Sequence, residues 1–154
     1  MQFRTLPLLL ALSALSATPA ALAADHAHHG KSLEHRKAIK LDAEEKAHIH
    51  MEMRLFLSTV QKIVTATAAN DMKTVGEAAR EAGMAAAHEV PGKLREKLPM
   101  EFKKMGHATH QGFDDLARDA ESLGDANHAL KQLGSVMSNC VSCHAVYRIE
   151  TGKH

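Results

Sequence analysis

Apolar side chains recur at steps of three and four residues along most of this chain, which is the spacing of one face of an α-helix. The first stripe comprises Ile49, Met53, Phe56, Val60, Ile63 and Thr67. Asp42 precedes it, with Glu45 three residues further on, as in a capping box. Leu57 and Val64 widen the stripe. The pattern predicts a helix from about residue 42 to 70.

Three further stripes follow the first. A second helix is expected from about residue 71 to 88, where Val90-Pro91-Gly92 stops it, and a third begins at Pro99 and ends at Leu123-Gly124. A fourth begins after Asp125 and continues to about Arg148. Their inner faces carry Val75, Ala79, Ala82 and Ala86; Phe102, Met105, Thr109, Phe113, Leu116 and Ala120; and Ala129, Leu133, Val136 and Met137. Because strand-like alternation is absent, the sequence predicts an all-α fold, an antiparallel up-down four-helix bundle.

The first residues have the pattern of a secretory signal. Arg4 gives a positive start, residues 6–15 are mostly Leu and Ala, and Ala21-Leu22-Ala23 offers a cleavage site. The apolar stretch is too short for a membrane span and contains prolines. We therefore expect a signal peptide at residues 1–23, no membrane insertion, and export to the periplasm.

A polar segment separates the signal from the helices. Residues 24–40 contain four histidines and no sustained apolar stripe, so we expect a mobile His-rich arm. A metal-binding tract is the alternative. The histidines are His26, His28, His29 and His35. The helical domain is then expected at residues 41–154.

Charge and composition limit which classes of partner or bound group are expected. The chain has 19 basic and 18 acidic residues, and loss of Arg4 with the signal balances them, so nothing indicates a nucleic-acid partner. There is no Trp, and Ala and Met supply much of the apolar content. Such a bundle has room for a large flat apolar guest, or packs as a plain Ala-rich bundle; composition alone does not choose.

The cysteines distinguish a bundle that holds a flat apolar guest from a plain Ala-rich bundle. Cys140-Val141-Ser142-Cys143-His144 is the attachment signature of c-type haem. Positions i, i+3 and i+4 share one face of a helix, so both thiols can reach the porphyrin vinyl groups while the imidazole binds iron. We predict one covalent haem held by Cys140 and Cys143, with His144 as the proximal iron ligand.

Three other readings of the cysteine pair compete. A disulfide across two residues of a helix has poor geometry and would constrain almost nothing. A thioredoxin-like site normally opens a helix after a strand, whereas this pair lies at the end of the last helix. A zinc site would need a second cysteine pair, and the chain has only two cysteines.

The motif and its position resemble those of the class II c-type cytochromes, the cytochrome c′ family. The matching residues are Cys140-Val-Ser-Cys143-His144-Ala-Val-Tyr147-Arg148, on the last helix of a predicted four-helix chain. The resemblance implies that Arg148 lies near the haem and its proximal His; an Arg facing the carbonyls of the helix end is the alternative. It also implies that two copies can pair as a homodimer.

The sixth iron ligand decides the function that the resemblance implies. Low-spin members supply a Met from the first helix and pass electrons, whereas high-spin members leave that side open and bind small gases. Met53 lies on the apolar stripe and is our candidate ligand. Met51, His50 and an open site, with Leu57 or Met53 over the iron, stay as alternatives. His88, His107, His110 and His128 are expected to be solvated or capping residues.

The sequence thus predicts an electron-transport protein, a periplasmic cytochrome that binds redox partner proteins. The alternative is a five-coordinate protein that binds NO or CO. A third reading is an exported metal-handling protein that uses the His-rich arm and free thiols. No nucleophile–base constellation is found, so we predict no enzyme activity.

Overall fold

The computed structural model describes residues 34–152. These residues are mostly helical, at 76%, which confirms the predicted helical class. The long elements are α1 (Ala43–Ala68), α2 (Met72–Glu81), α5 (Met100–Leu123) and α6 (Ala126–Val146). The expected signal at 1–23, and the histidines of the expected arm other than His35, lie outside the described residues.

The first helix begins where the sequence predicts. The Asp42 carboxylate accepts from the Glu45 backbone N–H at 2.9 Å, and the Asp42 N–H donates to the Glu45 side chain at 3.1 Å. This is the complete capping box. The predicted inner face is only partly right, because Leu57 and Val64 are 70% and 48% exposed. α1 ends at Ala68, and Asp71 then caps α2.

The second predicted helix is divided into two. α2 ends at Glu81, and a short α3 (Met84–Ala87) follows Gly83. A β-carbon on Gly83 would lie 1.9 Å from Asp114 Oδ1 of α5, so any other residue here requires the Asp114 side chain to move. Asp114 Oδ2 in turn accepts from the Met84 N–H at 2.9 Å. The break between α2 and α3 therefore lies where the chain passes close to α5.

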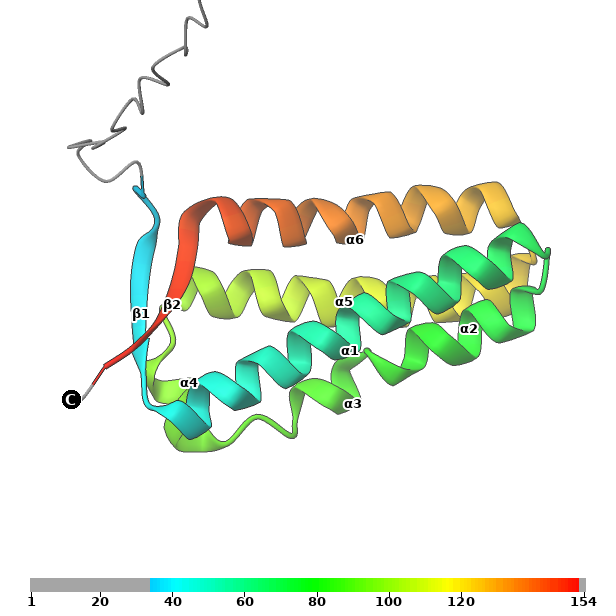
Figure 1. Cartoon of the computed structure of the whole chain (residues 1–154). Coiled ribbons are helices and arrows are strands. Elements are labelled where there is room, and N and C mark those ends of the chain that lie inside the picture. The colour runs from blue at the N-terminus through cyan, green and yellow to red at the C-terminus, as the bar shows by residue number, and fades with distance from the viewer. Residues whose placement is uncertain (1–33, 153–154) are drawn as a thin grey trace, which may run out of the picture. The chain divides into compact units, whose positions relative to one another are not determined.

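The long helices lie alongside one another, as Figure 1 shows. α1 contacts α2, α2 contacts α5, α5 contacts α6, and α6 contacts α1. The Phe56 and Phe113 rings are stacked in the core between them, with centroids 5.8 Å apart. Within residues 34–152, no helix combines the length and the apolar character needed to cross a membrane.

Two short strands correct the prediction that strands are absent. β1 (Lys37–Leu41) pairs in parallel with β2 (Tyr147–Thr151), with Lys37 opposite Tyr147 and Leu41 opposite Thr151. β1 includes the last residues of the expected mobile arm, so the ordered fold begins before residue 41. β2 replaces the end of the last predicted helix, since α6 stops at Val146.

A second apolar cluster lies under this pair of strands. It contains Ile39 and Leu41 from β1, Ile49 from α1, and Tyr147 from β2. Leu94 of α4 (Gly92–Lys97) and Leu98, which follows that helix, complete it. This cluster fixes the chain on both sides of the site described next.

Candidate cofactor site

The predicted attachment motif lies on one face of the last helix. α6 is continuous through residue 146, so Cys140, Cys143 and His144 occupy helical positions i, i+3 and i+4. Both cysteines are half-buried free thiols, and His144 is exposed. The Cys140 Sγ lies 3.8 Å from the Val136 carbonyl oxygen. Two sulfurs and an imidazole are therefore presented together near the helix end.

Burial raises the pKa of both cysteine thiols. For Cys143 the neighbouring Cys140 raises the pKa further, whereas a backbone hydrogen bond opposes part of the shift at Cys140. The thiols are thus protonated at neutral pH, and a thiolate is the form that attacks disulfides. This environment argues against the thioredoxin-like reading of the pair.

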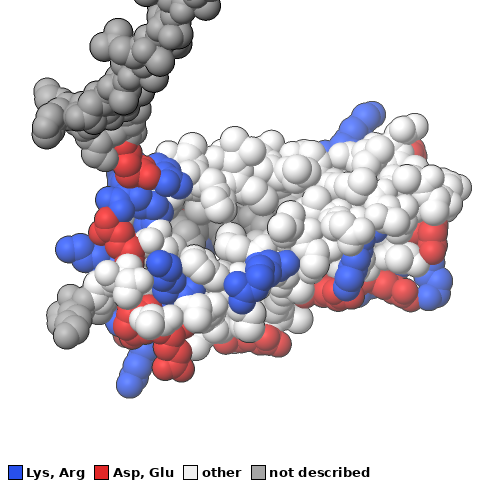
Figure 2. Space-filling model, in the orientation of Figure 1, with Lys and Arg blue, Asp and Glu red and all other residues white. Residues whose placement is uncertain are grey.

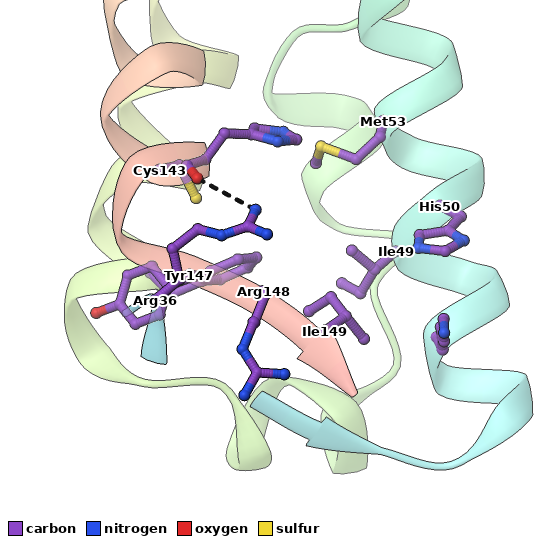
Figure 3. Close-up of a pocket in the computed structure, with 11 residues that line it drawn as sticks. Arg36, Ile49, His50, Met53, Cys143, Tyr147, Arg148 and Ile149 are labelled. Atoms are coloured by element: carbon purple, nitrogen blue, oxygen red, sulfur yellow. Dashed lines mark hydrogen bonds between the residues drawn. The ribbon is translucent and has the colours of Figure 1, made fainter. Parts of the chain in front are cut away.

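A pocket of about 240 Å³ opens beside Cys143 and His144. It lies between α6, α1 and β2, and Arg36, which precedes β1, and Phe102 of α5 also border it. Figure 3 shows Met53 reaching into this space from α1, with Cys143 on the facing helix. Its other lining residues are Arg36, Lys46, Ile49, His50, Tyr147, Arg148 and Ile149.

The pocket separates the candidate sixth ligands. Met53 and His50 both line it, in keeping with the stripe position of Met53 and the marginal position of His50. Met51 does not line it and is 51% exposed. Leu57, one of the two residues expected over the iron in an open site, does not line it and is 70% exposed. The structure thus brings Met53 and His144 to one pocket and leaves Met51 outside.

Arg148 lies in β2 and lines the same pocket. Its guanidinium forms an ion pair with Glu150, and its Nε is buried without a hydrogen-bond partner. α6 ends at Val146, so Arg148 lies in β2 just beyond the helix and not in its last turn. A buried, unpaired N–H at the pocket is available to an acceptor on a bound group.

Two cationic residues at the pocket were missed by the sequence analysis. Arg36, next to β1, donates through Nη1 to the His144 carbonyl at 3.5 Å, and Lys46 donates to the Thr151 hydroxyl at 3.3 Å. Figure 2 shows charged side chains of both signs gathered at this end of the described chain. Parallel pairing of the strands brings Arg36 here, and the sequence carries no local signal of that pairing.

Comparisons of the chain with protein-family models, with curated proteins and with solved structures found no match. The chemistry of the site therefore has to be argued from its own residues.

Those residues fit a c-type haem. Cys143 and His144 line the pocket, with the thioether sulfur of Met53 on the opposite wall, whereas Cys140 lies one helical turn back on the same face of α6 and does not line it. Two thiols and an imidazole are the groups that attach a c-type haem. The wall is largely apolar, with Ile49, Phe102, Tyr147 and Ile149 in it. The volume is below the 300–1,000 Å³ usual for small-molecule sites, so a porphyrin requires the walls to move apart. Among residues 34–152, no group of three or more His, Cys, Asp or Glu side chains could hold a metal ion.

Proposed function

We propose that the chain is an exported class II c-type cytochrome that carries electrons in the periplasm. In this proposal α1, α2, α5 and α6 form an antiparallel up-down four-helix bundle around one covalently attached haem. One observation carries the proposal: Cys140, Cys143 and His144 share a face of α6, and Met53 of α1 lines the same pocket as His144. Bound haem supplies reversible one-electron transfer at its iron.

Each residue of the site has a distinct part. Cys140 and Cys143 would hold the haem through thioethers, whatever the oxidation state of its metal. His144 would supply an imidazole nitrogen to the iron, and Met53 a thioether sulfur. Ligation by Met and His raises the reduction potential, as suits an electron carrier. Arg148 offers its unpaired Nε to an acceptor at the edge of the bound group.

The proposal assigns no catalytic residues. The imidazoles of His110 and His128 are paired with the carboxylates of Glu52 and Asp119. In the described part of the chain, neither imidazole is hydrogen-bonded to a Ser, Thr or Cys side chain that could act as a nucleophile. The expected partners are redox proteins that exchange electrons at the exposed edge of the site, where His144 lies.

The absorption spectrum of the natively produced protein tests this function. With His144 and Met53 both bound, the reduced protein has sharp α and β bands, and CO does not change them. A broad high-spin spectrum that shifts under CO contradicts electron carriage with a Met ligand. That outcome supports a five-coordinate protein that binds NO or CO.

Three matched variants on α1 identify the sixth ligand. Met53→Ala is expected to give a high-spin spectrum that responds to CO. Met51→Ala is expected to keep the low-spin spectrum, since Met51 is exposed outside the pocket. His50→Ala is expected to keep it as well, because this proposal assigns the sixth ligand to Met53 although His50 also lines the pocket. An unchanged low-spin spectrum in Met53→Ala contradicts its role. Loss of the low-spin bands in His50→Ala then transfers that role to His50.

A further inference from the structure

A second and larger cavity is lined by no residue of α6. Its volume is about 400 Å³, within the usual range for small-molecule sites. Residues of α1, α3 and α5, and of the segment that contains α4, line it. No residue of α6 or of the two strands does, and Phe102 alone borders both cavities. An inference from this cavity is therefore independent of the haem proposal.

The buried end of the cavity carries one carboxylate whose second oxygen is free. Glu52 Oε1 accepts from His110 Nε2 at 3.1 Å, and His110 Nδ1 donates to the Ala82 carbonyl at 2.8 Å. Both imidazole nitrogens are thus occupied, and His110 is only 3% exposed. Oε2 of Glu52 makes no hydrogen bond within residues 34–152. It can accept a hydrogen bond from a donor that enters the cavity.

The open end of the cavity is cationic. Lys103 and Arg95 line it together with His88 and His107. Arg95 donates to the Val90 carbonyl at 3.0 Å, and neither cation has a carboxylate partner within the described chain. Since Glu52 and His110 neutralise each other inside, the opening keeps a positive charge that favours an anion. Between the two ends the wall is apolar, formed by Met84, Val90, Leu98 and Phe102.

We propose that this cavity binds a small aromatic monocarboxylate that carries a hydroxyl group at its far end. The carboxylate lies at the opening near Lys103 and Arg95, and the ring lies against Phe102 and the aliphatic wall. The hydroxyl donates to Glu52 Oε2. A second anionic group at the far end would meet the Glu52 carboxylate, so dianions are rejected.

Calorimetric titration of the full chain with 6-hydroxy-2-naphthoate tests the proposal. Binding at one site is expected. Of two analogues, 2-naphthoate lacks the hydroxyl group and 2-naphthol lacks the carboxylate. Each analogue loses one charge-assisted contact and should bind roughly tenfold more weakly. No binding of 6-hydroxy-2-naphthoate, or equal binding of all three compounds, overturns the proposal.

Two pairs of variants locate the site. Gly106 lines the cavity, and a β-carbon there meets no atom within 4 Å, so Gly106→Leu fills the space without a clash in the helix. Gly134→Leu on α6 has the same open surroundings and serves as its control. Lys103→Gln is matched by Lys104→Gln, because Lys104 is 65% exposed and pairs with Glu101 outside the cavity.

Gly106→Leu is expected to weaken 6-hydroxy-2-naphthoate binding by more than roughly tenfold. Lys103→Gln should weaken it roughly threefold, and both controls should bind as the parent does. Unchanged binding in Gly106→Leu overturns the location. Should that variant prove unfolded by circular dichroism, the lysine pair decides: equal affinity in Lys103→Gln and Lys104→Gln overturns the role of the opening.

Discussion

His110 carries a titratable imidazole inside the core. Burial opposes its charge, but the hydrogen bond and charge of Glu52 and the hydrogen bond to the Ala82 carbonyl outweigh that penalty. The pKa of His110 is therefore raised above its ordinary value of 6.5. The edge of its ring also contacts Phe56, with centroids 5.0 Å apart. Both ring nitrogens face oxygen acceptors, so the folded structure favours the protonated imidazole.

The pH dependence of stability follows from this raised pKa. The contribution of His110 to the free energy of unfolding is complete below about pH 6.5, and it is lost as the pH rises through the pKa of His110 in the folded state. The free energy of unfolding, measured by urea denaturation, should therefore fall as the pH rises above about 6.5. His110→Gln should lower it by about 2 kcal/mol at the acid end and less at the alkaline end.

Substitution of the exposed His107, on the same helix, is the control for His110→Gln. His107→Gln should keep the parental pH dependence. A parental pH dependence in His110→Gln would mean that another group causes it. The sequence analysis expected His110 to be solvated or capping; it is buried and not solvated, but it does cap α2 through the Ala82 carbonyl. Its partner Glu52 is 58 residues away in the chain, so only the tertiary contact reveals the pair.

At the scale of the elements, helix faces were predictable and strand pairing was not. The capping box at Asp42 and the cap at Asp125 are local signals, and the structure has both. β1 and β2 are five residues each and pair residues 110 positions apart. Ile39 and Leu41 do alternate with Lys40, but a run this short is a weak signal for a strand. The last helix was therefore extended through Arg148 in error.

The strand pair should hold the pocket end of the chain together. Ile39 is 4% exposed in the cluster with Leu41 and Tyr147. Ile39→Ala is expected to lower the free energy of unfolding by about 2–4 kcal/mol. The exposed neighbour Lys40→Ala should change it by less than about 0.5 kcal/mol. Equal values for the two variants in urea denaturation would contradict a structural role for β1.

The close approach of α5 and α6 depends on a glycine. A β-carbon on Gly112 would lie 2.7 Å from Val136 Cγ2 of α6. Gly112→Ala should therefore lower the melting temperature, at a cost of about 1–3 kcal/mol. Gly134→Ala, with nothing within 4 Å, should raise stability by up to about 1 kcal/mol through helix propensity. If Gly112→Ala raised the melting temperature, α5 and α6 would have to lie further apart than they do in this structure.

At the scale of the whole molecule, the candidate site joins segments from both ends of the described chain. The sequence predicted Cys140, Cys143 and His144 from spacing alone, and Met53 from its helical stripe. It did not predict Arg36 or Lys46, because their place at the pocket depends on β1 lying beside β2. The chemistry read from the sequence therefore stays a prediction, whereas the surroundings that complete the pocket became visible only in the fold.

The mass of the natively exported polypeptide tests the central claim most directly. The claim predicts a chain that lacks the first 23 or 24 residues and is heavier by one haem, with the added mass on the peptide that contains Cys140, Cys143 and His144. An unmodified peptide, or one in which the two sulfurs are joined to each other, would contradict it.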